Sequence, residues 1–598
     1  MLFASKYAVL RIHLCKGKLK HAPPFSLPRL LSLMAFALAA CAFGQVQKTA
    51  APAEVPVAVH LEPLREVEIP ARIGILSEAR LGLGEAIERV LASDPDLRVA
   101  RIERDEAFTN IRAALGVYDP VMGLRAYRTK SVLPVASVLG GTADGKLTQG
   151  ELNATPQLSG AFPALGGTYA LSFVNSRQTS DSSFNTLNPL YPTQLALNLT
   201  QPLWRGLHFD ENRHRVQVAR QNASLTEQQL RQRVTEVVTQ AVQAYWELVF
   251  AWQNMAVESE AVRLAERQYE SNRRQAEAGI LAPIDVVAAQ TQVATFQQGV
   301  LLAQQALTQA ENNLKSMMLP NRADLLWGAA LVPETQAQPE AKLPAFEAAV
   351  KRALAGRPEL AESDISIAMN MLDTRLSREN ARPRVDAYAN LSTSGLAGAQ
   401  LPAGPNSLTA AFTPMVTLLD QLAALNNLPG VTNLSFGSVG IPPMFLGSYG
   451  QSLSNLASGR FPSVQVGVQV SLPIRNRTAE AQAAVSVAEG RRLRALQDQI
   501  GMAVEADVRN TLQAATSARA RLEAAALARR SAEEQYSSEQ RQFQAGTSTV
   551  FLVFERQTDL ITARSREVRA RADVAEALAN LDRATARTIE ARGIRVGE

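Results

Sequence analysis

The longest regular pattern of apolar positions in the chain follows Gly206. Between that residue and Gly279 the sequence contains neither glycine nor proline. Apolar side chains recur there every three or four residues, with a mean period of about 3.6, at Leu230, Val234, Val237, Ala241, Tyr245, Leu248, Trp252 and Met255. The pattern predicts one uninterrupted helix that reaches roughly 100 Å at the usual rise per residue. Helices of this length are stable in water when they pack in a coiled coil or bundle.

A second stretch of similar length, from about 478 to 545, has the composition of a long helix, with Gly490 and Gly501 as its weak points. Both long patterns end at a glycine, Gly279 in the first and Gly546 in the second. Glycine readily adopts the positive φ that ends a helix. Since helical sequence resumes a few residues later, each glycine predicts a tight turn followed by a returning helix.

Shorter stretches alternate between apolar and polar residues, as β-strands do when their two faces meet different surroundings. The clearest runs are residues 464–472 and 195–200. Such strands lie either on a soluble core or, as in an outer-membrane barrel, with one face on lipid and the other on a polar interior. Long helical stretches separate the runs and leave them no obvious shared core. We therefore expect Val464, Val466, Val468, Val470 and Leu472 to face lipid, and Gln465, Gln469 and Ser471 to face the lumen.

The same order of patterns occurs twice. Pro95 and Pro358 are 263 residues apart, and so are Pro120 and Pro383. In both halves a strand-like run meets a proline and then the long helical stretch, at Leu-Thr-Gln-Pro-Leu-Trp-Arg-Gly (199–206) and at Val-Ser-Leu-Pro-Ile-Arg-Asn-Arg (470–477). These agreements predict two copies of one unit, repeat 1 at 81–335 and repeat 2 at 336–592, followed by a C-terminal tail at 593–598. The stretches 129–190 and 395–460 exceed a minimal unit, and we expect either long loops or extensions of the strands.

The N-terminal region changes the interpretation of the charge. Residues 1–40 contain six Lys or Arg and no acidic residue, so the formal charge of +5 falls to −1 without them. A basic start followed by an apolar run too short to span a bilayer is typical of a secretory signal peptide. We expect the signal at 1–40 and a Pro-rich linker at 41–80. Because the positive charge belongs to the signal, the composition gives no support to nucleic-acid binding.

Cys15 and Cys41 are the only cysteines, so the exported chain has no pair for a disulfide. Leu38-Ala39-Ala40-Cys41 resembles the lipobox of bacterial lipoproteins, in which the signal is cut before a cysteine that carries lipid. This resemblance predicts lipid attachment at Cys41. The alternative is ordinary cleavage after Gly44, which would discard Cys41 with the signal.

The duplicated strand-proline-helix junction, the paired Ala…Leu…Pro-Asp/Glu-Leu openings and the Ala-Gly-Thr-Ser-Thr-Val turn resemble the TolC-like outer-membrane efflux proteins over residues 81–590. The resemblance implies a mostly α-helical fold with a membrane β-barrel. It implies a homotrimer in which each subunit contributes four strands to one twelve-stranded barrel, above a periplasmic tunnel of helices. The location would be the outer membrane of a Gram-negative bacterium, extending into the periplasm.

The resemblance also implies a function and partners. The protein would be the outer-membrane channel of a tripartite efflux or type I secretion system, and it would passively conduct substrates delivered by an inner-membrane pump and a periplasmic adaptor (membrane fusion protein). Its barrel would contact outer-membrane lipid. The family's helical turns face the adaptor, so Gly279, Ile280, Gly546 and Thr547 carry over as adaptor contacts. The chain departs from the family's pattern at Pro283 and Ile284, and at Leu552, where Asp is common.

Two other functions compete with the channel. A periplasmic adaptor also has a long helical hairpin, but one hairpin rather than a whole duplicated unit. A coiled-coil structural protein of the envelope would explain the helices and leave the repeated strand-to-helix junction unexplained.

The residues favour no enzyme, no cofactor and no metal site. The chain has five histidines and no cysteine pair, which leaves little for hydrolytic or redox chemistry. His208, Asp210, Glu211 and His214 form its one local cluster, and the histidines lack the i,i+4 spacing of helical zinc sites. Acidic residues at this position suit the first turn of a helix. Gly140 to Leu147 nearly matches a phosphate-binding loop, but it lacks the final Ser or Thr and a following helix. Tyr245, Trp246 and Trp252 have the spacing of helix packing rather than of a ligand platform.

Overall fold

The computed structural model describes residues 70–136, 145–182, 185–335, 342–401, 407–426, 428–429 and 441–594. The chain divides into two units, Met1–His60 and Leu61–Glu598, and all described residues belong to the second. The predicted signal peptide, Cys41 and most of the Pro-rich linker therefore lie outside the described residues. So does most of the glycine-rich stretch that begins at Gly140. These predictions stay predictions.

A pair of helices opens each half of the chain. A single residue separates the two helices of the first pair, and Asp94 explains the break, because its side chain accepts the N–H of Leu97 (3.0 Å) and Pro95 occupies the first turn. Pro358 begins the corresponding helix of the second pair. The first pair is α1 (Leu83–Ser93) and α2 (Pro95–Leu115), and the second is α5 (Phe346–Gly356) and α6 (Pro358–Asn380).

The two long helices are α3 (Glu211–Glu277) and α9 (Arg477–Gln544). Both are uninterrupted, as predicted, and α9 continues through Gly490 and Gly501. Gly279 and Gly546 follow them with φ of +72° and +75°, which only glycine adopts readily. The returning helices are α4 (Pro283–Met318) and α10 (Val550–Ala584). Each turn thus produces an antiparallel pair, α3 with α4 and α9 with α10.

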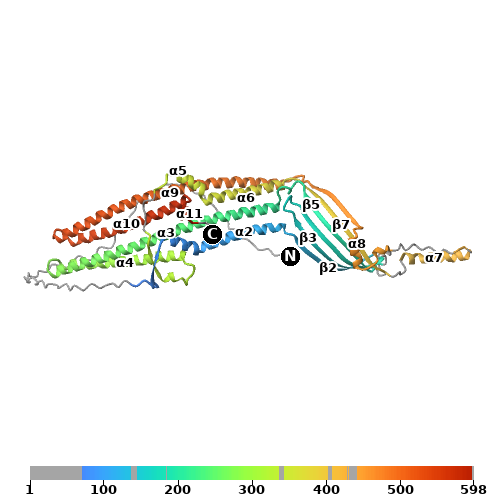
Figure 1. Ribbon diagram of the computed structural model, residues 1–598, viewed down its shortest axis with the longest axis horizontal. Coiled ribbons are helices and arrows are strands. Elements are labelled where there is room, and N and C mark those ends of the chain that lie inside the picture. Colours follow the sequence, from blue (N-terminus) through green and yellow to red (C-terminus); the bar gives the residue numbers. More distant parts are fainter. Residues whose placement is uncertain are drawn as a thin grey trace, which may run out of the picture. The chain divides into compact units, whose positions relative to one another are not determined.

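The helices form a layer with α3 in its middle (Figure 1). Toward the turns, α3 packs against α4 and α10, and α10 packs against α9. Toward the strands, α2 and α6 flank α3, and α6 packs against α9. Tyr245 and Trp246 are buried in the main core of this layer, which confirms them as packing residues. Trp252 is 42% exposed and does not share that burial.

The main sheet is antiparallel throughout, in the order β2-β3-β4-β5-β7-β8. Its strands are β2 (Val121–Pro134), β3 (Lys146–Ala161), β4 (Thr168–Ser180), β5 (Leu187–Pro202), β7 (Arg384–Gln400) and β8 (Pro462–Ser471). A separate parallel pair joins β1 (Ser77–Leu81) to β6 (Ala329–Pro333). The first residues of β1 fall in the stretch that we expected to be linker.

The sheet corrects the expected number of strands per subunit from four to six. The extra strands, β3 and β4, come from the 129–190 stretch. Residues of that stretch alternate well enough to form a complete hairpin, and this hairpin lies between β2 and β5. The strands of this stretch are therefore parts of the main sheet.

The 395–460 stretch contributes to both helices and strands. Strand β7 extends to Gln400, and the helices α7 (Ser407–Leu425) and α8 (Tyr449–Ala457) follow. A short helix, α11 (Thr588–Ala591), lies near the C-terminus. Single 3-10 turns occur at Gly116–Tyr118, Leu325–Gly328 and Pro443–Phe445. Among the described residues, no helix combines the length and apolar character needed to cross a membrane.

Candidate functional site

The two faces of the six-stranded sheet differ in chemistry. Paired residues of neighbouring strands point to the same side of a sheet, so the register assigns every residue to a face. Met122 pairs with Leu158, Leu158 with Leu171, Leu171 with Leu197, Leu197 with Leu391 and Leu391 with Val464. We call this side the apolar face, and it carries Met122, Leu124, Leu158, Leu171, Phe173, Leu195, Leu197, Leu199, Leu391, Val464, Val466, Val468 and Val470.

The other side is the polar face, which carries Arg125, Tyr127, Gln157, Ser172, Asn198, Thr200, Asn390, Gln465 and Gln469. Its side chains bind one another across strands. Asn390 Nδ2 donates to Gln465 Oε1 (3.1 Å), and Gln194 Nε2 donates to Ser392 Oγ (3.3 Å). The alternation predicted for β8 thus extends over all six strands.

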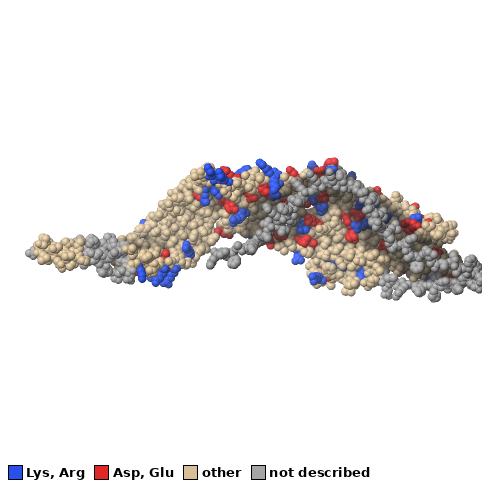
Figure 2. Space-filling view, turned by 180° about the vertical axis from the view of Figure 1, so that it is seen from behind, with Lys and Arg blue, Asp and Glu red and all other residues tan. Residues whose placement is uncertain are grey.

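The valines expected to face lipid lie on the apolar face and are solvent-exposed in the isolated chain. Val464, Val466, Val468 and Val470 are 55–73% exposed. Leu472 follows the last residue of β8 and is also exposed. Figure 2 shows one side of the molecule, on which charged residues gather over the helices while much of the surface of the sheet is uncharged. An extended uncharged surface of this kind suits contact with hydrocarbon.

Helix α8 limits the apolar face at the end of the sheet farthest from α3. Thr193 Oγ1 and Ser452 Oγ are 2.9 Å apart, and Asn455 Nδ2 donates to the carbonyl of Leu396 (2.8 Å). Tyr449 donates to Asn175 Oδ1 (2.6 Å). The uncovered apolar stretch of β8 and the residue after it, 464–472, matches the 9–11 residues with which a tilted strand crosses a bilayer.

The strand-to-helix junction at 199–206 contacts the turn of the hairpin that β3 and β4 form; this is called the inserted hairpin below. Gly166, in the turn between β3 and β4, has φ +66°, and a Cβ there would lie 2.6 Å from the carbonyl oxygen of Gly206. Gln201 Nε2 donates to the carbonyl of Leu165 (2.7 Å). Glycine is therefore required at 166 for both its conformation and its space, and the hairpin is fixed to the start of α3.

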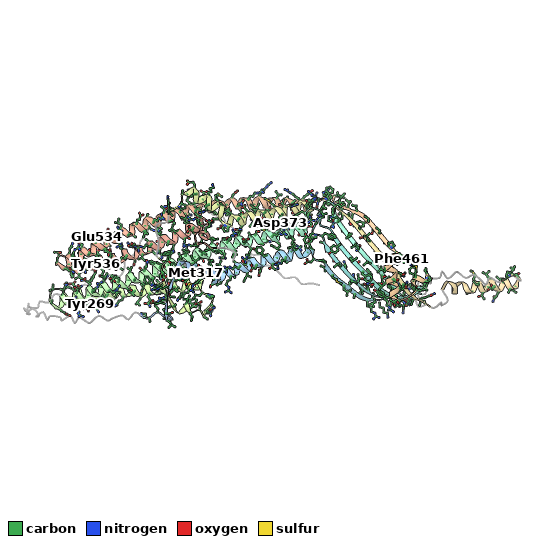
Figure 3. All side chains as sticks on the ribbon, in the orientation of Figure 1. Tyr269, Met317, Asp373, Phe461, Glu534 and Tyr536 are labelled. Carbon is green, nitrogen blue, oxygen red and sulfur yellow. The ribbon has the colours of Figure 1, made fainter. Side chains whose placement is uncertain are left out.

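The cluster at the start of α3 acts in helix capping and packing. Asp210 accepts the N–H of Arg213 (2.8 Å) and so caps the helix, as its acidic character predicted. Asp373 lies on α6 (Figure 3), and its Oδ1 is 2.7 Å from His214 Nε2. The contact between His214 and Asp373 joins α3 to α6, in the other half of the chain.

The four predicted adaptor contacts lie at the two turns. Gly279, Gly546 and Thr547 are exposed, and Ile280 is 76% exposed. Backbone bonds close both turns, from Ile280 N to Gln275 O (2.8 Å) and from Thr547 N to Gln542 O (3.0 Å). Two further residues near the turns, Ile284 and Phe551, are exposed, and the sequence analysis did not propose them as contacts. Each follows its glycine by five residues, and that matched spacing could have identified them.

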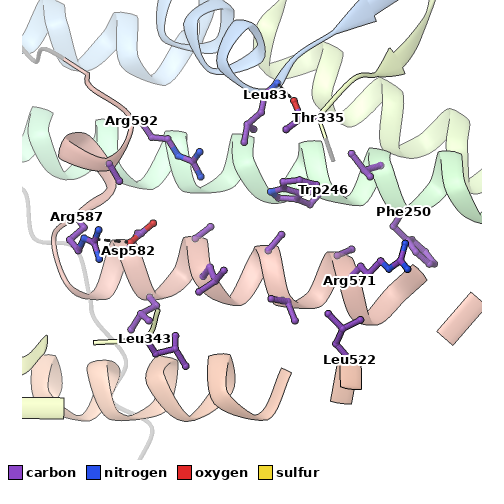
Figure 4. Close-up of a pocket in the computed structure, with 18 of the residues that line it drawn as sticks. Leu83, Trp246, Phe250, Thr335, Leu343, Leu522, Arg571, Asp582, Arg587 and Arg592 are labelled. Carbon is purple, nitrogen blue, oxygen red and sulfur yellow. Dashed lines mark hydrogen bonds and ion pairs between the residues drawn. The ribbon is translucent and has the colours of Figure 1, made fainter. Parts of the chain in front are cut away.

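A cavity of about 940 Å³ lies between α3 and α10 (Figure 4), lined by residues that include Trp246, Phe250, Leu522, Arg571, Asp582 and Arg587. Two of the arginines that line it form ion pairs. Arg571 binds Glu567 (2.7 Å), and Arg587 lies 3.9 Å from Asp582. Burial raises the pKa of the Asp582 carboxyl, although Arg587 and Arg592 oppose that shift. With these two arginines paired and apolar side chains between them, the cavity belongs to the packing of the helical layer.

Comparisons with known proteins agree with this architecture. A family model described as outer membrane efflux protein matches residues 86–318 and 444–587. No curated protein matches the sequence. Solved structures that match include the CmeC outer membrane channel of Campylobacter jejuni (13% identity, 86% of this chain and 87% of that chain, TM-score 0.57) and the channel protein CusC (14%, 87% and 99%, 0.56). The outer membrane protein VceC of Vibrio cholerae also matches (15%, 84% and 95%, 0.53).

Proposed function

The chain belongs to the outer membrane efflux protein family, and from this premise we propose that it is the outer-membrane channel of a tripartite efflux or type I secretion system. It is passive. An inner-membrane pump supplies the energy, a periplasmic adaptor connects the two, and this chain conducts the substrate across the outer membrane. It lies in that membrane and extends into the periplasm, as its relatives do.

The two-faced sheet is the observation that carries the proposal. An exposed apolar face and a polar face that carries amides and hydroxyls are what a membrane barrel presents to lipid and to water. A soluble adaptor or a coiled-coil protein of the envelope would leave such an apolar face exposed to water. In hydrocarbon an open sheet would leave backbone groups of its edge strands unpaired, so the sheet needs further copies to close it.

The helical layer also supports a homotrimer, because its two edges carry exposed apolar side chains. On one edge α9 exposes Val485, Met502 and Leu527. On the other, α2 exposes Val99 and Ile102, and α4 exposes Leu302. Copies arranged around an axis bring one kind of edge against the other and bury both sets. The result is a closed wall of helices continuous with the barrel.

Two variants test the membrane assignment. Val468→Arg places a charge on the apolar face, and near mid-membrane it should lower barrel stability by about 2–4 kcal/mol. Gln469→Arg, one residue later on the polar face, is the matched control and should change stability little. The measurement is heat resistance of the outer-membrane trimer in mild detergent. If the Val468→Arg trimer were as heat-resistant as the parent and the Gln469→Arg trimer were not, the assignment of the two faces would be wrong. A chain found only in soluble or inner-membrane fractions would refute the channel.

The proposed adaptor contacts need their own test, because a glycine at a turn can serve only to end the helix. Replacing Ile280→Glu and Thr547→Glu alters the exposed tips and leaves both glycines in place. We expect the variant to form its trimer, to lose crosslinking to the adaptor and to lose export. If this variant exports substrate at the parent level, the turns serve only to end the helices.

Lipid attachment at Cys41 remains a prediction from the sequence. Mass spectrometry of the mature N-terminus checks it directly. We expect a chain that begins at Cys41 with a lipid mass added, whereas an unmodified chain that begins at Gln45 would show ordinary signal cleavage.

A further inference from the structure

We propose that three copies of this chain close a barrel of eighteen strands, in which β2 of each copy pairs with β8 of the next. The pairing line between copies is called the seam below. The inference rests on the proposed function for the number of copies, and on the six-stranded sheet for the number of strands. It gives the channel a wider membrane pore than four strands per subunit would form.

The inserted hairpin is integral to the sheet. Strand β3 pairs with β2 over the whole length of β2, from Val121 with Ser159 to Pro134 with Lys146. Strand β4 pairs with β5 from Thr168 to Gln178. The close approach of Gly166 to Gly206 fixes the turn between β3 and β4 against the strand-to-helix junction. With backbone pairing on both sides and a fixed turn, β3 and β4 count as barrel strands.

The two edge strands have the polarity that a seam requires. Five successive antiparallel pairings make β2 and β8 run in opposite directions. When β8 of one copy meets β2 of the next, the new pair is antiparallel as well, and the alternation continues around the barrel. An even number of strands per copy is needed for this result, and six satisfies it.

The chemistry of the faces also continues across the seam. On β2, Met122 and Leu124 lie on the apolar face while Arg125 and Tyr127 lie on the polar face. On β8 the valines and glutamines divide in the same way. Nearly every residue of both strands is exposed in the isolated chain. A second copy of the chain therefore fits each edge with its apolar side chains toward lipid and its polar ones inward.

The apolar region of β2 is shorter than that of β8. Beyond Ala126 the same face of β2 carries Arg128 and Lys130, and Arg128 shares its row with Arg177 through Leu152. Cationic side chains at the end of an apolar belt suit the level of the lipid headgroups. Only residues 121–127 of β2 therefore need a partner within hydrocarbon, and the ten residues of β8 can cover them.

The consequence is a wide pore in the membrane. Barrel diameter grows roughly linearly with the number of strands, so eighteen strands give about one and a half times the diameter of twelve. Barrels of 16–18 strands leave an aqueous channel. The polar face supplies its lining, including Arg125, Gln157, Asn198, Asn390 and Gln469.

Cysteine crosslinking tests the seam. The sequence has only Cys15 and Cys41, so the parent chain serves as the blank. Leu124→Cys is combined in turn with Val464→Cys, Val466→Cys, Val468→Cys or Val470→Cys, because barrel closure staggers neighbouring strands. Outer-membrane trimers are oxidised and run on denaturing gels without reductant. We expect covalent dimers and trimers for at least one pair, and none for Leu124→Cys with Gln465→Cys, whose side chains lie on opposite faces.

A second pair separates failure of this inference from failure of the proposed function. If Leu171→Cys on β4 crosslinks to Val468→Cys of another copy and no β2 pair does, the β2–β3 hairpin has left the barrel. The barrel then has twelve strands and the efflux channel stands. If no outer-membrane trimer forms in the parent chain, the proposed function fails first.

A deletion supplies an independent measurement. Replacing residues 135–186 by Asn-Gly joins β2 directly to β5, which run antiparallel and can form a hairpin with a two-residue turn. The barrel diameter in nanodiscs, measured by electron microscopy, should then fall by about one third. An unchanged diameter would overturn the inference. The crosslinking result decides the question on its own if the shortened chain does not assemble.

Discussion

The two long helices are nearly equal in length but very different in burial. Helix α3 has 67 residues, of which 20 are buried, whereas α9 has 68 residues, of which seven are buried. Helix α3 lies between neighbours on both sides, and α9 lies at the edge of the layer. Their buried residues differ accordingly, with Tyr245, Trp246 and Leu248 in α3 and mostly alanine in α9.

This difference teaches that the position of a helix in the layer, and not its length or periodicity, decides what its apolar residues do. In α3 they hold one subunit together. In α9 the exposed ones, Met502 and Leu527 among them, are available to a neighbouring copy. The same substitution should therefore affect folding in one helix and assembly in the other.

The largest loss of stability is expected from a substitution in the middle of α3. Leu248 is fully buried in the main core. Leu248→Ala removes buried methyl groups and leaves a cavity, so the free energy of unfolding of the subunit should fall by about 2–5 kcal/mol. Urea denaturation of the detergent-purified chain measures this. A loss below about 1 kcal/mol would mean that α3 is not the central helix of the fold.

The corresponding test in α9 uses a different substitution, Leu527→Asp, at a side chain that is 66% exposed. Exposed substitutions usually change subunit stability by no more than about 0.5 kcal/mol. We expect the trimer to dissociate at a lower temperature, because the neighbouring copy would bury a carboxylate. The temperature at which the trimer band disappears in detergent measures this. A trimer as heat-resistant as the parent would place α9 outside the interface.

A smaller effect, a gain in stability, is expected from a substitution of Gln557 on α10. Its side chain is fully buried, and neither amide atom has a hydrogen-bond partner among the described residues. Gln557→Leu removes that desolvation cost and should raise the free energy of unfolding by about 1 kcal/mol. Gln292, which donates to Thr558 Oγ1 (3.0 Å), is the control, and Gln292→Leu should give no gain. Destabilisation by Gln557→Leu would contradict the prediction.

The smallest expected effect is a change in the way that stability depends on pH. Burial raises the pKa of Asp582 in the folded chain. A raised carboxyl pKa favours the folded state below its unfolded value, about 4, and this contribution is lost as the pH rises through the folded value. Asp582→Asn does not titrate, so the variant should gain stability relative to the parent between about pH 4 and neutrality. Thermal unfolding at both ends of this range measures the difference, and parallel profiles would contradict it.

Much of the fold could be predicted because it depends on local chemistry. The unbroken spacing after Gly206 predicted α3, and Gly279 and Gly546 predicted the two turns, since positive φ is a property of single residues. Pro95 and Pro358 marked the starts of matching helices. The alternation in β8 predicted a two-faced strand, and the register extends that pattern to the other five strands.

The number of strands could not be predicted, because it depends on pairing between distant residues. Tyr169 to Phe173 alternates like a strand, but a loop extension and a barrel strand share that pattern. Pairing with β5 shows that these residues belong to the main sheet. The position of α9 at the edge of the layer could not be predicted for the same reason, since composition does not show which helices become neighbours.

The tight contact between Gly166 and Gly206 has a mechanical consequence. It ties the sheet to the start of α3, whereas the turn at Gly279 lies at the opposite end of the helix and contacts none of the described strands. A rod of roughly 100 Å that pivots by about six degrees at its clamp moves its tip by about 10 Å. Small angular changes of α3 near the sheet would thus become large displacements at the turn that follows it.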